Sequence, residues 1–481
     1  MATVNRRRVL SGVAGGLGLA LVAPSRGLDR TRADVIVAGG GLAGLTAALN
    51  LLDAGLSVIV LEASARPGGR IHTAYQLPGQ PELGAVEVGP LYARVRDMAR
   101  RLDLPLEPRG NPVGAFSLGI GGQLVNMEDW PESPLNQTVG DERVVPPPAL
   151  LQTVITQHNP LLRADDWLRP EARPLDISVH DWLVAQGLSD EGLRLVNEGL
   201  ITADFNDTSI LPSLQDGLRM GLARTAAGSR PSGGVDKFTG GTSRLTTAMV
   251  EMLGDRLRVD QRVRAIAMNE AGVEITCESG AVFRSDFVIA AMPFPALRRI
   301  AVTPALTGIQ ADAVANMRWA NTSQVFLRHR AGDYWERDGF APSLWTDGPV
   351  NLYRQQVDSD RIVAVLVGRK ADALDQLSPA EQGAFVVNDL VALRPELRGK
   401  VDAVATHSWR EEVNIGGCRH DFRPGTVTRF VPAMFAPHAR MHFAGEHTRL
   451  LEIGMESAME SGERAALEIV SGQPQEPIRT S

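Results

Sequence analysis

Residues 33–73, ADVIVAGGGLAGLTAALNLLDAGLSVIVLEASARPGGRIHT, contain the features of a dinucleotide-binding unit. The apolar run 34–38 does not alternate with polar residues, so it predicts a buried parallel strand. Gly39, Gly41 and Gly44 then complete the pattern G-x-G-x-x-G. In that pattern the first glycine permits a tight turn, the second lets backbone approach a pyrophosphate, and the third lets the helix pack on the strand.

The residues after these glycines extend the same unit. Leu42 and Ala43 lead into an apolar helix over 45–52, whose N-terminal amides would face phosphates. A second strand over 57–61 ends at Glu62, at the distance where an acid binds a ribose. An ordinary strand–helix–strand turn remains the alternative. The joint occurrence of strand, turn, helix, strand and acid favours a nucleotide site.

Composition excludes several classes of protein. The 481 residues are 44% hydrophobic and 22% charged, as in globular proteins, and they are enough for two domains. A formal charge of −7 gives no sign of the excess positive charge that is typical of nucleic-acid-binding proteins. No apolar run is long enough to cross a bilayer. Cys277 and Cys418 alone form no disulfide framework, and no metal-ligand spacing occurs, so we expect no metal.

The N-terminus reads as a targeting segment. Residues 5–10, NRRRVL, match a twin-arginine pattern, and a short Gly- and Ala-rich apolar stretch follows over 11–22. The alternative is a disordered basic tail beside a chance apolar run. The signal predicts that the folded protein passes through twin-arginine export machinery to the periplasm.

Residues 66–73, RPGGRIHT, resemble the G-G-R-x-x-T extension of the flavin-containing amine oxidase superfamily, in its monoamine oxidase-like branch. The resemblance implies FAD, with Ala63, Gly69 and Arg70 at the cofactor. It also extends to the strands expected over 257–290, where the residue at Val263 packs by the adenine in this family. An ordinary core valine would look the same.

The C-terminal third carries two further stretches of the family. Residues 409–418, WREEVNIGGC, resemble the monoamine oxidase segment whose cysteine holds FAD through an 8α-thioether. This implies cofactor roles for Trp409 and Cys418, although a buried free thiol remains the alternative. Residues 441–448, MHFAGEHT, resemble the F-A-G-E-x-T signature, and Gly445, Glu446 and the later Met455 would hold flavin and pyrophosphate oxygens.

The resemblance implies an α/β fold in which an FAD-binding Rossmann-like domain of the glutathione reductase type is interleaved with an α+β substrate domain. We assign residues 1–30 to the signal and 476–481 to a tail. Residues 31–92, 236–300 and 410–475 form the discontinuous FAD domain, and 93–235 and 301–409 form the substrate domain. We expect mainly loops over 107–148 and helices over 149–227, with strands near 324–329, 362–367 and 403–407 and a helix over 379–393.

Three residues are candidates for the reaction itself. Gln324 falls where the family places a lysine that water bridges to flavin N5, which puts efficient reaction with oxygen in doubt. The two aromatic residues that sandwich the amine in ordinary monoamine oxidases are absent, and Arg419 follows the cysteine. We hypothesise that Glu87 and Arg419 line the cavity as a charged pair. They either neutralise each other or receive a zwitterionic or polar amine, with Arg419 binding an anion.

The implied activity is oxidation of an amine C–N bond by hydride transfer to flavin N5, followed by hydrolysis of the imine to a carbonyl compound. Oxygen or a periplasmic carrier would accept the electrons. Two alternatives stay open, namely a C–C desaturase similar to carotenoid or porphyrinogen oxidases, and a non-catalytic flavoprotein. The identity of the amine is also open, as is a homodimeric assembly.

Overall fold

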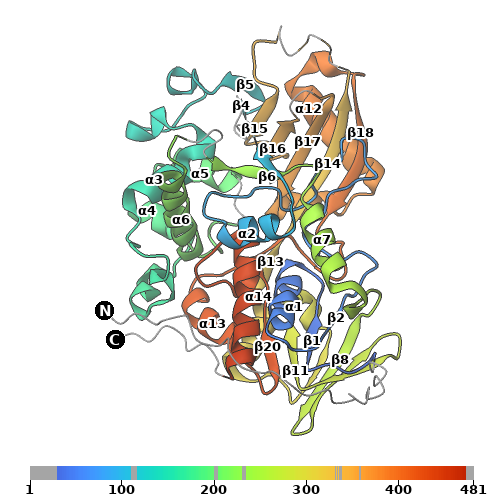
Figure 1. The fold of residues 1–481 in the computed structure, drawn as a ribbon. Helices are drawn as coiled ribbons and strands as arrows, with labels where there is room; N and C mark the ends of the chain where they lie inside the picture. Colours follow the sequence, from blue (N-terminus) through green and yellow to red (C-terminus); the bar gives the residue numbers. More distant parts are fainter. Residues whose placement is uncertain are drawn as a thin grey trace, which may run out of the picture.

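The computed structural model describes residues 30–109, 116–199, 204–229, 234–330, 332, 334, 338–356 and 359–472. The predicted export signal, apart from its last residue, and the predicted tail lie outside these residues. Two sheet-containing parts stand one above the other in Figure 1, and a group of helices lies beside them.

A five-stranded parallel sheet forms the centre of the lower part, in the order β20-β11-β1-β2-β7. Its strands are β1 (Val35–Ala38), β2 (Val58–Leu61), β7 (Leu257–Arg258), β11 (Phe287–Ala290) and β20 (Met441–Phe443). All four residues of β1 are fully buried, because strands flank it on both edges, α1 packs on one face and residues of β8 and β9 pack on the other. The uninterrupted apolar run predicted a buried parallel strand correctly.

Helix α1 (Leu42–Asp53) follows β1 directly and packs along α14 (Gly454–Ser471), although more than 400 residues separate their starts. Figure 1 shows the two helices side by side against the parallel sheet. A second sheet of the lower part has the order β10-β9-β8-β12. It contains β8 (Val263–Asn269), β9 (Gly272–Cys277), β10 (Val282–Ser285) and β12 (Ala301–Thr303).

The upper part contains a seven-stranded sheet in the order β18-β14-β17-β16-β15-β4-β5. Its strands are β4 (Phe116–Ile120), β5 (Gln123–Asn126), β14 (Thr322–His329), β15 (Ser343–Thr346), β16 (Leu352–Gln355), β17 (Arg361–Val367) and β18 (Val401–Ser408). Two short pairs complete the strands, β3 (Leu106–Pro108) with β6 (Asp236–Phe238) and β13 (Arg318–Ala320) with β19 (Arg419–Asp421).

The expectation of mainly loops over 107–148 was wrong for β4 and β5. These strands form a hairpin whose two-residue turn is Gly121-Gly122, with both φ angles positive. Two consecutive left-handed residues are what a tight hairpin turn requires, so Gly-Gly was a strand signal here rather than a loop signal. The hairpin extends the seven-stranded sheet through the pairing of β4 with β15.

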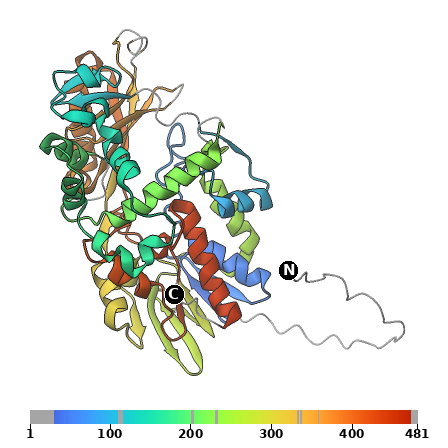
Figure 2. The same ribbon diagram turned by 90° about the vertical axis from the view of Figure 1, so that its left-hand side faces the viewer.

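The helical prediction for 149–227 was correct. That region holds α3 (Pro147–His158), α4 (Val179–Ala185), α5 (Asp190–Glu198) and α6 (Leu211–Ala227). These helices lie beside the two sheets in Figure 1, on the side that faces the viewer in Figure 2. The remaining helices are α2 (Ala93–Arg101), α7 (Ser243–Leu253), α8 (Phe294–Leu297), α9 (Gly308–Asn316), α11 (Gly368–Leu374), α12 (Pro379–Leu393) and α13 (Val427–Met434). A capping box of Ser378 and Glu381 starts α12, as the sequence pattern favours.

The strands sort between the two sheets in a regular way. All five strands of the parallel sheet come from 31–92, 236–300 and 410–475, and all seven strands of the larger sheet come from 93–235 and 301–409. The domain boundaries themselves stay a prediction. Cys277 and Cys418 are both free. Within the described ranges, we find no helix with the length and apolarity needed to span a bilayer.

Candidate active site

One long cavity of about 650 Å³ runs from the carboxyl ends of the parallel strands toward the seven-stranded sheet and α6. Its wall combines parts of the chain that are far apart in sequence. Sixteen of the predicted site residues line it: Gly39, Gly41, Leu42, Ala43, Glu62, Ala63, Gly69, Arg70, Val263, Gln324, Trp409, Cys418, Arg419, Gly445, Glu446 and Met455.

The glycine turn and Glu62 line the end of the cavity where the sequence predicts the nucleotide, called here the nucleotide end. Glu62 Oε2 accepts a hydrogen bond from the Gly40 backbone N–H at 2.9 Å, and its other oxygen accepts from the backbone N–H and the hydroxyl of Ser64. Gly41 is the N-cap of α1 and supplies no side-chain cap, so the first amides of the helix stay open for an anion. A Cβ placed on Gly41 would meet nothing within 4 Å.

Gly44 does not line the cavity. A Cβ on Gly44 would lie 2.0 Å from the carbonyl oxygen of Gly39, so this residue lets α1 pack closely against the turn. That is the role of the third glycine in the motif. Gly44 therefore shapes the site without facing it.

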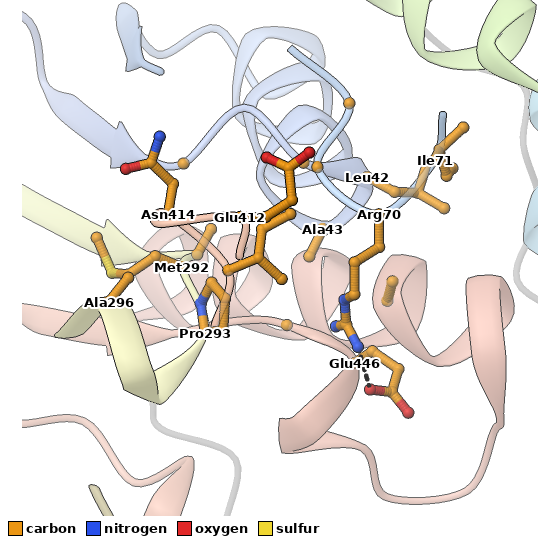
Figure 3. Close-up of a pocket in the computed structure, with 18 of the residues that line it drawn as sticks. Leu42, Ala43, Arg70, Ile71, Met292, Pro293, Ala296, Glu412, Asn414 and Glu446 are labelled. Carbon is orange, nitrogen blue, oxygen red and sulfur yellow. Dashed lines mark hydrogen bonds and ion pairs between the residues drawn. The ribbon is translucent and has the colours of Figure 1, made fainter. Parts of the chain in front are cut away.

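Arg66 and Arg70 give the segment after Glu62 its shape. Arg66 donates to the carbonyl oxygens of Gly69 and Ile71, which closes the tight turn around Gly68 and Gly69. The Arg70 side chain extends into the cavity (Figure 3). Its Nη1 atom lies 2.7 Å from the carbonyl oxygen of Cys418 and 3.2 Å from Glu446 Oε2. The Arg70 side chain thus connects its own segment, residues 66–73, with Cys418 and with Glu446 of the 441–448 segment.

Glu446 is held between cations. Burial raises the pKa of its carboxyl group, but His420, Arg70 and Arg419 lower it by more, so the pKa lies well below its usual range. Glu446 begins the short 3₁₀ helix η8 (Glu446–Thr448). The N-terminus of α14 opens into the same cavity, since Ile453, Gly454 and Met455 line it and the helix has no side-chain cap.

Trp409 and Cys418 both lie on the cavity wall. The Trp409 indole N–H donates to the Leu83 carbonyl oxygen at 2.9 Å, which fixes the ring beneath the segment after Arg70. The Cys418 backbone N–H donates to Ala320 at the start of the β13–β19 pair. Cys418 is only partly buried, whereas Cys277 is fully buried on β9, where burial raises the pKa of its thiol to about 11.

Gln324 lies on β14 opposite His407 of β18. Its side-chain oxygen is buried and has no hydrogen-bond partner among the described residues, and the same is true of Nε2 of His407. Burial, with Arg66 adding to it, lowers the pKa of His407 to about 4, so this imidazole is neutral at physiological pH. Two unsatisfied polar atoms thus belong to a cross-strand pair beside the cavity, and an ordered water would satisfy such atoms.

The hypothesis of a Glu87–Arg419 pair was wrong. Glu87 is absent from the cavity wall, and its carboxylate forms an ion pair with Arg109 instead. The Glu87 side chain is 51% exposed, which sequence position alone could not reveal. The charge partner of Arg419 is Asp216 of α6, with 3.8 Å between Nη2 and Oδ2. Sequence reasoning missed Asp216, because an acid within an amphipathic helix has no motif around it.

The residues present fit FAD. The cavity presents an acid at the end of β2 for a ribose, and the uncapped N-termini of α1 and α14 for pyrophosphate and flavin oxygens. The open space at Gly41 allows a ligand to approach the backbone closely. Among the described residues, no cluster of three or more metal-binding side chains occurs.

Comparison with known proteins agrees with this geometry. Residues 42–470 match the family described as flavin containing amine oxidoreductase. The human flavin-containing amine oxidase B is 24% identical over 469 residues, which cover 91% of this chain and 86% of that protein. The enzyme of the same name from Cavia porcellus is 27% identical over 473 residues, covering 92% and 86%.

Two solved structures share the fold. Wild-type putrescine oxidase bound to putrescine superimposes with a TM-score of 0.74 at 23% identity, covering 92% of this chain and 99% of that one. Cyclohexylamine oxidase from Brevibacterium oxydans gives the same TM-score at 24% identity, with the same coverage. The matched family spans nearly the whole described chain, so this protein belongs to the flavin-containing amine oxidoreductases and is itself an amine oxidoreductase.

Proposed function

We propose that this protein uses FAD to oxidise the C–N bond of an amine to an imine, which water then hydrolyses to a carbonyl compound. The observation that carries the proposal is the single cavity in which Arg70 joins the glycine-motif segment, the Cys418 loop and Glu446. This one cavity contains both a nucleotide end and a polar substrate end.

A bound FAD would supply the hydride acceptor, and the protein would supply position and electrostatics. Glu62 and the open amides of α1 would hold the nucleotide half. We propose that Gln324 holds a water with its buried side-chain oxygen, at the position where the family resemblance implies a lysine. The neutral His407 opposite it adds no positive charge there.

The test is anaerobic mixing of the purified holoenzyme with amines, followed by analysis of the products. Loss of flavin absorbance, with release of ammonia and an aldehyde or ketone, supports amine oxidation. Product that carries a new C=C bond and retains its nitrogen would instead support the desaturase alternative. A flavin that light reduces but no amine bleaches would identify a non-catalytic flavoprotein.

We also propose that Cys418 binds FAD covalently through its sulfur, since it lines the cavity and is only partly buried. Acid precipitation of wild-type protein should leave the yellow colour in the pellet, with flavin mass on the Cys418 peptide. Cys418→Ala should release the colour. Cys277→Ala is the matched control, because that thiol is buried on β9, and it should retain the colour. Colour in the wild-type supernatant would show non-covalent FAD.

The proposal also covers the electron acceptor and the location of the protein. Gln324 in place of a lysine is the reason to compare oxygen with an artificial electron carrier as acceptor. We propose export through the twin-arginine route because of residues 5–10. A reporter fused after residue 30 should reach the periplasm, and replacing Arg6, Arg7 and Arg8 together with lysines should abolish its export.

A further inference from the structure

A cluster of charged side chains stands at the substrate end of the cavity, away from the nucleotide motifs. Asp216 comes from α6, Arg449 directly follows η8, and Arg419 begins β19. All three line the cavity. None of the cofactor motifs requires an acid at 216 or a base at 449, so the cluster calls for its own explanation.

Asp216 and Arg449 form the fixed part of this cluster. Arg449 Nη1 donates to Asp216 Oδ1 at 2.6 Å, and the Arg449 side chain is only 4% exposed. Its guanidinium also lies over the ring of Trp167, 5.2 Å from the centroid. The hydrogen bond to Asp216 and the contact with the Trp167 ring together hold the Arg449 guanidinium in place.

Arg419 is the open part of the cluster. Its side chain is 50% exposed, and its one ion-pair partner among the described residues is Asp216, at 3.8 Å. That separation is too long for a hydrogen bond. The guanidinium therefore keeps its donors available to the cavity.

The other carboxylates nearby have partners closer to them than Arg419 is. Glu446 is bound by Arg70 and His420, and Glu452 forms an ion pair with Arg219. Together, Arg419, Arg449 and Asp216 carry a net charge of +1. The surrounding protein lowers the pKa of Arg419, but Asp216 and Glu446 raise it by more, so the group stays charged.

We propose that Arg419 receives the carboxylate of a zwitterionic substrate, an ω-amino acid whose amine is the group oxidised. This inference rests on the proposed amine oxidation and narrows its substrate class. The planar fork of a guanidinium matches a carboxylate, and Asp216, held by Arg449, sets the position of that fork. A diamine fits less well, because its second ammonium group would lie beside an uncompensated guanidinium.

The test compares matched substrates on the holoenzyme. β-Alanine, γ-aminobutyrate and ε-aminocaproate are each assayed beside the n-alkylamine of equal carbon number, with putrescine as the diamine. For at least one pair, kcat/KM for the amino acid should exceed that of the alkylamine by about tenfold or more. Arg419→Gln should reduce this ratio at least about tenfold, and Arg419→Lys should restore part of it.

Arg423→Gln is the control for loss of positive charge. Arg423 is an exposed arginine just beyond β19 that does not line the cavity, and its replacement should keep the wild-type ratio. Binding gives a second readout that needs no turnover. Addition of n-butyrate, which has no amine to oxidise, should perturb the flavin spectrum of the wild-type and Arg423→Gln proteins, and not that of Arg419→Gln.

The outcomes separate the inference from the proposed function. If alkylamines or putrescine reduce the flavin as well as every amino acid does, or if Arg419→Gln leaves the ratio unchanged, the inference is overturned and amine oxidation stands. If n-butyrate perturbs wild type and Arg419→Gln equally, Arg419 is not the carboxylate site. If no amine of any series reduces the flavin, both proposals fall.

Discussion

The nucleotide end and the substrate end of the cavity are built in different ways. At the nucleotide end, residues of the 39–70 segment line the wall and are held by backbone turns and hydrogen bonds within that segment. At the substrate end, Asp216, Arg419 and Arg449 come from three elements more than 200 residues apart at the extremes and meet only by their side chains.

This difference indicates which part of the cavity sets cofactor binding and which part sets the choice of substrate. A backbone-built site binds a common ligand group and tolerates little change where it is tightly packed, since an atom added at Gly44 displaces the main chain. A site built from side chains on separate elements can change its charge pattern without disturbing the fold. The same scaffold can therefore keep its cofactor while its substrate end varies, which is why fold alone does not name the amine.

The largest effect that tests this contrast is expected at the glycine turn. Gly44→Ala should destabilise the protein by about 3 kcal/mol, because its Cβ would stand 2.0 Å from the Gly39 carbonyl oxygen and the backbone must shift. Chemical denaturation of the apoprotein measures the change in the free energy of unfolding.

Gly41→Ala is the control, since a Cβ at this position meets nothing within 4 Å. It should change stability by less than about 0.5 kcal/mol while weakening FAD binding. Equal destabilisation by both variants would show that the turn is not tightly packed.

A second effect is expected where a side chain supports the backbone at the nucleotide end. Glu62→Gln should weaken FAD binding about 30-fold, or about 2 kcal/mol, because a charged acceptor of three hydrogen bonds is lost. Titration of deflavinated protein with FAD, in a Cys418→Ala background, measures it. Asp53→Asn removes an exposed carboxylate paired with Arg101 and should leave the affinity unchanged. An unaltered affinity in the Gln variant would argue against a ribose-binding role for Glu62.

The third prediction concerns His447, a buried histidine on the cavity wall, and the dependence of protein stability on pH. Burial, with nearby His420 and Arg70, lowers the pKa of His447 to about 3, below the ordinary value of 6.5. Between these two pH values the unfolded chain binds more protons than the folded one, so stability is lost as pH falls through that range. His447→Leu should lessen the slope of unfolding free energy against pH by up to about 1.4 kcal/mol per pH unit.

Denaturation curves collected from pH 6.5 downward measure this slope. His158→Gln, at the exposed end of α3, is the control and should keep the wild-type slope. A steeper loss of stability in the Leu variant than in wild type would contradict burial of a neutral imidazole.

The smallest effect is expected for Glu87, which the structure removes from the substrate end. Glu87→Gln should change stability by less than about 1 kcal/mol, because the carboxylate is half exposed and pairs with Arg109 outside the cavity. Its substrate preference should match wild type within about twofold, in contrast to Arg419→Gln. If Glu87→Gln changed amine preference as much as Arg419→Gln does, Glu87 would have to belong to the substrate site.

Sequence reasoning located the cofactor motifs because their physics is local. A glycine turn, an acid after the second strand and a helix start are specified by consecutive residues, and sixteen of the predicted residues line the one cavity. The bounds of α12 were also predicted correctly, since Ser378 and Glu381 mark its start. The roles of these residues in binding and catalysis stay predictions.

The sequence by itself thus determined the parallel sheet around β1, the family to which the chain belongs, and the position of the cysteine loop. Only the tertiary structure decided that Arg419 faces Asp216 rather than Glu87, and that Arg449 anchors that acid. The physical reason is the distance along the sequence between the residues that interact. Turns and strand patterns arise from neighbouring residues, whereas an ion pair between α6 and β19 exists only after the helices have packed beside the sheets and fixed the directions of their side chains.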